Sequence, residues 1–141
     1  MMTAMNDETA ILYLTTEGKM IEWRWPDFTP AEMLCRCREC DSVIDEQFMD
    51  DLQALRDDFG HGMVITSGHR CQIHNRNIGG ALDSDHLKAV AADVAVGGAK
   101  AYDLIGRAMK HGFNRIGIDQ RGDSRFIHLG KSGSQRVIWS Y

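Results

Sequence analysis

Two histidines and one aspartate have the residue types and the spacing of a catalytic metal site. His86 and Asp93 lie seven residues apart, and His128 lies inside the apolar run FIHL at 126–129. Two imidazoles and a carboxylate suit a zinc ion with one coordination position open, whereas a structural site would fill all four positions. Asp93 interrupts an apolar stretch, and a buried carboxylate is costly unless it is paired or bound to metal. The alternative is that these histidines are ordinary hydrogen-bonded residues.

The elements that must position these side chains are predicted from hydrophobic periodicity and capping residues. A capping box begins a short helix at 29–32, and an aspartate cap and a glycine bound a longer helix over 45–60. We expect a further helix over 101–111 and strands over 63–67, 91–96, 115–119, 126–129 and 137–140, whereas residues 68–85 show no regular period. Helices early and antiparallel strands late in the chain indicate an α+β domain.

Composition limits the class of protein. The chain has 141 residues, of which 43% are apolar and 26% charged, which is typical of one folded domain. A net charge of −4 argues against a nucleic-acid-binding module, because such modules normally carry a basic surplus. No apolar run approaches the ~18 residues that a membrane helix needs. We expect an N-terminal extension over 1–24, which could form a short hairpin, a single domain over 25–141, and a monomer.

Four cysteines form a second group of potential ligands. Cys35, Cys37 and Cys40 follow the first short helix, and Cys71 is adjacent to Arg70. Four thiolates could make a structural zinc site, they could pair as disulfides with three possible connectivities, or some could be buried free thiols. We expect a link between the early cluster and Cys71, as thiolate–zinc or as one disulfide. Either link would hold the N-terminal helix beside Arg70.

An ordered series of short motifs resembles a known family. The series resembles the zinc D-Ala-D-Ala carboxypeptidases and L-alanyl-D-glutamate endopeptidases, including the VanY-type enzymes and small phage endolysins. The matching segments are ITSGHRC at 65–71, HNR at 74–76, GG at 79–80, SDHL at 84–87, AAD at 91–93, FIH at 126–128 and WSY at 139–141. The resemblance extends from about Trp25 to the last residue, and the order of the motifs makes it specific.

The resemblance implies a fold, a cofactor and a set of site residues. The fold would be of the hedgehog/DD-peptidase type, an antiparallel sheet with helices packed on one side. The cofactor would be zinc, and the substrate would be a peptide stem of peptidoglycan. The zinc ligands would be His86, Asp93 and His128. Arg70 would hold a substrate carbonyl or the developing oxyanion, Ser84 would support the substrate or the first ligand, and His69, at a position that is usually tyrosine, could still donate a hydrogen bond to substrate.

Several positions depart from the usual pattern of that family. Ala89 occupies a position that is usually glycine, which is tolerable if its φ is negative. Gly130 replaces an acidic residue that usually follows two positions after the third ligand. Arg125 replaces the carboxylate that is the general base in several relatives. Metal binding is therefore better supported than catalysis.

The general base must then come from another carboxylate. Asp123 is the nearest carboxylate before His128, and Gly122 could allow the turn to curl back over the metal. We predict Asp123 as the base, with Asp119 and Asp85 as alternatives. The competing interpretation of Asp123 is a solvent-facing turn residue, because aspartate is favoured in turns.

These observations predict a small zinc metallopeptidase that cuts peptidoglycan stems, in the manner of an endolysin. The N-terminus MMTAMNDETA lacks the basic and apolar regions of a secretory signal peptide. We therefore expect synthesis in the cytoplasm and action on the cell wall after release, during phage or prophage lysis. Two alternatives remain: a non-catalytic protein of the same fold that binds zinc or a cell-wall peptide, and an interaction module built on a four-cysteine zinc site.

Overall fold

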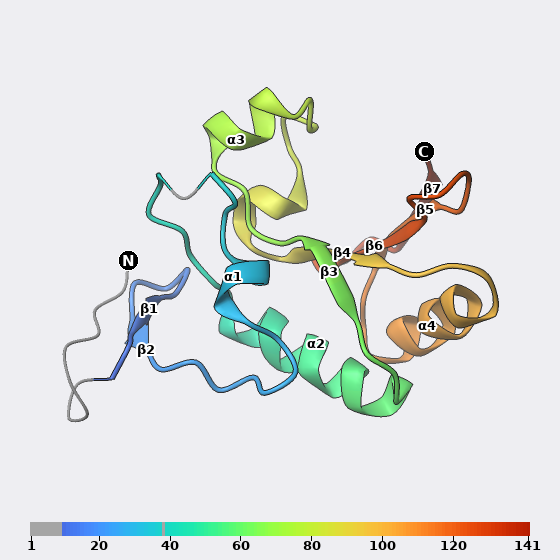
Figure 1. The fold of residues 1–141 in the computed structure, drawn as a ribbon, viewed down its shortest axis with the longest axis horizontal. Coiled ribbons are helices and arrows are strands. Elements are labelled where there is room, and N and C mark those ends of the chain that lie inside the picture. The colour runs from blue at the N-terminus through green and yellow to red at the C-terminus, as the bar shows by residue number, and fades with distance from the viewer. Residues whose placement is uncertain (1–9, 38) are drawn as a thin grey trace.

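The structure, a computed structural model, describes residues 10–37 and 39–141 (Figure 1). The helices are α1 (Pro30–Met33), α2 (Glu46–Phe59), α3 (Gln72–Asn77), the 3₁₀ helix η1 (Asp85–Lys88) and α4 (Gly98–Lys110). The strands are β1 (Tyr13–Leu14), β2 (Met20–Ile21), β3 (Val64–Ser67), β4 (Ala91–Ala95), β5 (Arg115–Asp119), β6 (Phe126–Gly130) and β7 (Val137–Ser140).

The main sheet has five strands in the order β3-β4-β6-β5-β7. The pairs β3/β4, β4/β6 and β6/β5 are antiparallel, so the predicted α+β class is confirmed. The edge strand β7 differs from the expected antiparallel pattern, because it pairs in parallel with β5. The physical reason is the connection. After β6 the chain reverses direction and passes β5 to reach the edge of the sheet, and because β6 is antiparallel to β5, the returning strand β7 runs parallel to β5.

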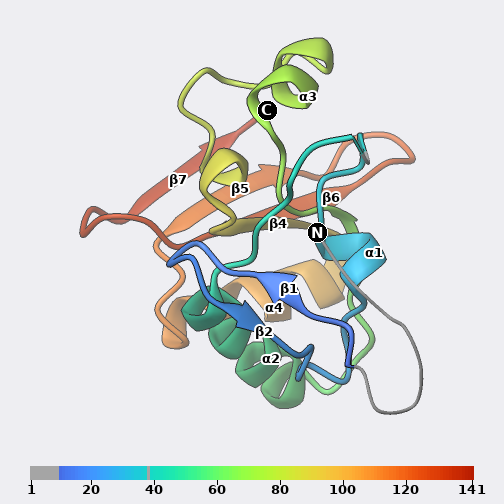
Figure 2. The ribbon, with the colours of Figure 1, turned by 90° about the vertical axis from the view of Figure 1, so that its left-hand side faces the viewer.

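The two long helices cover one face of this sheet. Figure 2 shows α2 and α4 on one side of the sheet and α3 on the other. The core between α2, α4 and the sheet includes Leu52, Leu104 and Ile127, which are fully buried. The predicted ends of α2 are confirmed: Asp45 accepts a hydrogen bond from the backbone of the first turn, and Gly60 ends the helix with a φ of 74°.

The N-terminal segment packs on the domain. β1 and β2 form the short hairpin considered for this segment. Tyr13 is buried in the main core, and the indole of buried Trp25 donates a hydrogen bond of 2.9 Å to Asp50 on α2. Residues 1–9 of the predicted extension lie outside the described residues.

The segment between β3 and β4 is less irregular than expected. It contains α3, which the sequence did not reveal because this helix has only six residues and no apolar period. Its cap is unusual, since the sulfur of Cys71 accepts a hydrogen bond from the backbone N–H of His74. Among the described residues, no helix has the length and apolar character that a membrane span requires.

Candidate metal centre and active site

The structure brings His86, Asp93 and His128 together from three separate elements. His86 lies on η1, while Asp93 and His128 are directly paired across β4 and β6. Ile127 and Leu129 flank His128 on β6 and point into the core. Because side chains alternate along a strand, Asp93 and His128 project from the opposite face of the sheet. All three side chains are buried.

The ligand atoms of this trio fit a tetrahedral zinc ion. Oδ1 of Asp93 lies 3.2 Å from Nε2 of His86 and 3.0 Å from Nδ1 of His128. Zinc bonds of about 2.0–2.1 Å with tetrahedral angles place neighbouring ligand atoms about 3.3 Å apart. The three donor atoms all lie within 4.8 Å of one another. Three protein ligands leave one position open, as in a catalytic site.

The other ring nitrogen of His86 is fixed by the backbone. Nδ1 of His86 lies 2.7 Å from the carbonyl oxygen of Gly68, to which it donates, so Nε2 is the nitrogen that can ligate a metal once it is deprotonated. Gly68 packs closely on the end of α1: a Cβ at this position would lie 2.4 Å from the carbonyl oxygen of Met33. Glycine at 68 therefore allows the close approach that sets the carbonyl under His86.

The other ring nitrogen of His128 faces Asp85. Nε2 of His128 is buried and has no hydrogen-bond partner within the described part of the chain, and it lies 3.9 Å from Oδ2 of Asp85. The same carboxylate accepts a hydrogen bond of 2.5 Å from Nε of Arg115. A Cβ at Gly130 would lie 2.9 Å from Oδ2 of Asp85 and 3.1 Å from Nε2 of His128. Glycine at 130 thus leaves the space that Asp85 occupies.

Electrostatics favour a charged carboxylate at the centre of the trio. Burial alone would raise the pKa of Asp93, but hydrogen bonds from His128 and His86 outweigh it and hold that pKa well below its usual range. Burial likewise opposes the charged form of His128, yet the carboxylates of Asp85 and Asp93 raise its pKa. Metal binding at the trio therefore competes with protonation of His128, because a ligating imidazole must be neutral.

Arg70 lies in the same pocket, and its guanidinium is held in place from several sides. Nε donates to Ser67 at 3.1 Å and Nη1 donates to Asn75 at 2.9 Å. Nη2 lies 3.6 Å from Oδ2 of Asp93, and the Arg70 side chain is only 12% exposed. Burial lowers the pKa of Arg70, and the neighbouring Asp93 opposes that shift. The guanidinium is therefore a fixed positive charge beside the metal ligands.

The pocket around the trio has a volume of ≈ 410 Å³ and an aromatic wall from β6 and β7. Phe126, Trp139 and Tyr141 line it. The indole of Trp139 lies with its centroid 5.0 Å from that of His128. It sits over Gly117 on β5, where a Cβ would come within 2.7 Å of the ring. The pocket thus combines a charged floor with an apolar side.

Other predicted site residues have different positions. Ser84 lines the pocket and its hydroxyl accepts a hydrogen bond of 3.2 Å from the backbone N–H of His86. His69 is buried outside this pocket, with Nδ1 2.7 Å from the hydroxyl of Ser42. The structure does not bring Asp123 to the trio, because its exposed side chain lies in the loop between β5 and β6. Its role as base stays a prediction that this geometry does not support.

Three further features differ from what the sequence indicated. Arg115, which holds Asp85, carries no local motif that could have identified it. Asp85 was expected only as an alternative base, whereas it lies behind His128. Alanine at 89 was expected to be tolerated if its φ were negative, but its φ is +60° at the C-terminal end of η1. An alanine in this left-handed conformation is strained.

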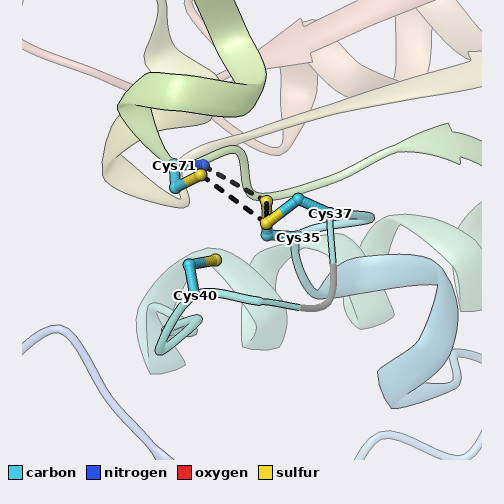
Figure 3. A group of neighbouring side chains, drawn as sticks. All are labelled: Cys35, Cys37, Cys40 and Cys71. Carbon is cyan, nitrogen blue, oxygen red and sulfur yellow. Dashed lines mark hydrogen bonds between the residues drawn. The ribbon is translucent and has the colours of Figure 1, made fainter.

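The four cysteines also converge. Their sulfur atoms lie within 4.8 Å of one another, between the segment after α1 and the start of α3 (Figure 3). All four are free thiols, so the structure contains no disulfide between the early cluster and Cys71. The alternative link through thiolates and zinc stays a prediction.

An α+β fold that holds two histidines and an aspartate in a pocket, with one coordination position left open, presents the ligand set of a catalytic zinc centre. A family model described as Peptidase M15 matches residues 26–130 of the chain. The zinc D-Ala-D-Ala carboxypeptidase of Streptomyces albus G is 33% identical over 91 residues, which cover 63% of this chain and 35% of that relative. The chain belongs to the peptidase M15 family, which confirms the resemblance, and its cofactor is zinc.

Proposed function

We propose that this chain is a zinc peptidase that hydrolyses peptide bonds in the stem peptides of bacterial peptidoglycan, of the D-Ala-D-Ala carboxypeptidase or the L-alanyl-D-glutamate endopeptidase type. The observation that carries the proposal is the convergence of His86, Asp93 and His128 in a pocket that also contains Arg70. The relative named as a D-Ala-D-Ala carboxypeptidase supports the substrate class.

The trio would hold the metal through Nε2 of His86, a carboxylate oxygen of Asp93 and Nδ1 of His128. Bound zinc supplies a Lewis acid that polarises a carbonyl and lowers the pKa of water to about 7. The protein contributes orientation: the carbonyl of Gly68 holds His86, and Asp85 faces the outer nitrogen of His128. These outer contacts keep both rings aimed at one point.

Arg70 is the group that would bind negative charge on the substrate. Its guanidinium is anchored by Ser67 and Asn75, and it borders the trio through Asp93. A peptide carboxylate or the oxyanion that develops during hydrolysis would gain a preorganised charge-assisted hydrogen bond there. The aromatic wall of Trp139 and Tyr141 supplies apolar contact for the small side chains of a stem peptide.

The test is mass spectrometry of muropeptides after digestion by the purified chain, with and without a metal chelator. We expect loss of a terminal D-alanine or cleavage after L-alanine, abolished by the chelator. His86→Ala, Asp93→Ala and His128→Ala should each lose the zinc of this site and the activity, because too few ligands remain. Full zinc content and activity in all three variants would contradict the assignment.

A non-catalytic binding protein of the same fold is the second candidate, and one observation favours it. Besides Asp93, the carboxylates that line the pocket are Asp83 and Asp85. Asp85 is held by Arg115 behind His128, and Asp83 is an exposed loop residue. Zinc-dependent binding of muropeptides without any cleavage would support this candidate over the peptidase.

We further propose that the chain acts on the cell wall after release from the cell that makes it, as an endolysin does. Support comes from the substrate class, since peptidoglycan lies outside the cytoplasm. The test is expression in bacterial cytoplasm with and without a co-expressed holin. Lysis that requires the holin would support release, and rapid lysis without it would contradict this proposal.

A further inference from the structure

A second group of metal-ligating side chains lies apart from the His–Asp–His trio. Cys35 and Cys37 follow α1, Cys40 lies a few residues further on, and Cys71 is the cap of α3 (Figure 3). Figure 3 shows the four side chains directed toward one shared space. Cys35 is buried and the other three are partly buried, so the cluster is largely shielded from solvent.

The distances between sulfurs suit a shared metal ion. Sγ of Cys37 lies 3.4 Å from Sγ of Cys35 and 3.7 Å from Sγ of Cys71. A disulfide bond would require about 2.05 Å. A zinc ion with four bonds of about 2.3 Å to sulfur places neighbouring sulfurs about 3.8 Å apart. The whole set lies within 4.8 Å, which is compact enough for a single ion.

The surrounding backbone is arranged to support thiolates. The N–H of Cys71 donates to Sγ of Cys35 at 3.3 Å, and the N–H of His74 donates to Sγ of Cys71 at 3.4 Å. Such N–H donors stabilise the negative charge on a metal-bound sulfur and orient it. The imidazole of His74 is not part of the cluster, and the donor set that the described residues provide consists of sulfur alone.

We propose that Cys35, Cys37, Cys40 and Cys71 bind a second, structural zinc ion. Four thiolates fill all tetrahedral positions, so the ion takes no substrate and leaves no open position for chemistry. Sulfur-only tetrahedral sites select zinc or iron. No carboxylate within residues 10–37 and 39–141 belongs to the cluster, which disfavours magnesium and calcium because these ions prefer oxygen ligands. The proposal does not depend on the peptidase activity, because the two groups share no residue.

The second zinc would hold the pocket wall in place. It would tie the segment after α1 to Cys71, which directly follows Arg70 in the chain. The same two segments already touch through the backbone, where the N–H of His69 donates to the carbonyl of Met33 at 2.8 Å. A metal-linked clamp at this junction restricts the backbone that carries Arg70.

The experiment is a zinc count on the 141-residue chain, measured by elemental mass spectrometry. We expect two zinc ions per chain in the parent, one in His86→Ala, one in Cys37→Ser and none in the double variant. His74→Ala is the matched control and should keep two. Cobalt-loaded His86→Ala should show thiolate-to-cobalt charge transfer in the near ultraviolet, and this band should disappear when Cys37→Ser is added.

A second measurement keeps the proposal testable if the cysteine variants do not fold. A mercurial reagent that titrates the thiols of His86→Ala should release its one remaining zinc as four thiols react. No zinc in that variant, iron in its place, or an intact mass that shows a disulfide in the parent would each overturn the proposal. If His86→Ala contains no zinc while Cys37→Ser still contains one, the four-cysteine site is refuted and the active-site assignment stands.

Discussion

Oδ2 of Asp85 lies 3.9 Å from Nε2 of His128, in the space that a side chain at residue 130 would otherwise fill. In the sequence, Gly130 replaces the acidic residue that usually follows two positions after the third ligand in the family. The structure shows a carboxylate at the same place, contributed by η1 and held by Arg115. Asp85 thus supplies a charged neighbour for His128 without an acidic residue at position 130.

Asp85→Asn should weaken zinc binding at the trio by about 10- to 100-fold, because His128 loses the charged group that orients it. Competition with a chromophoric chelator measures the affinity. If the second zinc interferes, the comparison is made in protein that also carries Cys37→Ser. Asp83→Asn is the matched control, since Asp83 lines the same pocket but is exposed. Equal affinity in Asp85→Asn and the parent would show that Asp85 does not position His128.

Arg70→Ala should leave zinc content unchanged and reduce kcat/KM by roughly 10²-fold or more, as expected for a group that stabilises an oxyanion. Arg70→Lys should restore only part of the rate, because one ammonium cannot reproduce the contacts to both Ser67 and Asn75. Arg76→Ala, at an exposed position on α3, serves as the control. Unchanged turnover in Arg70→Ala would reduce Arg70 to a structural residue.

Ala89→Gly should raise the free energy of unfolding by about 1 kcal/mol, since glycine adopts a φ of +60° without the steric cost that alanine pays. Chemical denaturation of the zinc-loaded protein measures the change. Ala99→Gly, on the exposed side of α4, should instead lower stability. A destabilised Ala89→Gly would mean that the methyl group contributes more by packing than the conformation costs.

Asp123→Asn should retain turnover within about twofold, because exposed aspartates in turns lie outside the chemistry unless the loop moves. Rates on a muropeptide substrate and zinc content are compared with the parent. A collapse in rate with normal zinc would instead restore Asp123 as the base, and it would require the loop after β5 to close over the trio.

Local sequence determined much of the framework and the identity of the ligand set. The cap at Asp45 and the glycine at 60 set the ends of α2, because capping depends on neighbouring backbone groups. The types and order of His86, Asp93 and His128 predicted an open zinc site, because few residue types ligate zinc and strand alternation places two of them on one face.

Only the tertiary structure decided which other groups reach that site. His69 follows the chain toward Ser42 and away from the pocket, while Asp85 reaches His128 across the space at Gly130. Such contacts join residues far apart in sequence, and the direction of a loop depends on packing more than on local propensity. For the same reason, composition left the state of the cysteines open, and the fold brought the sulfur of Cys71 within 3.7 Å of Cys37.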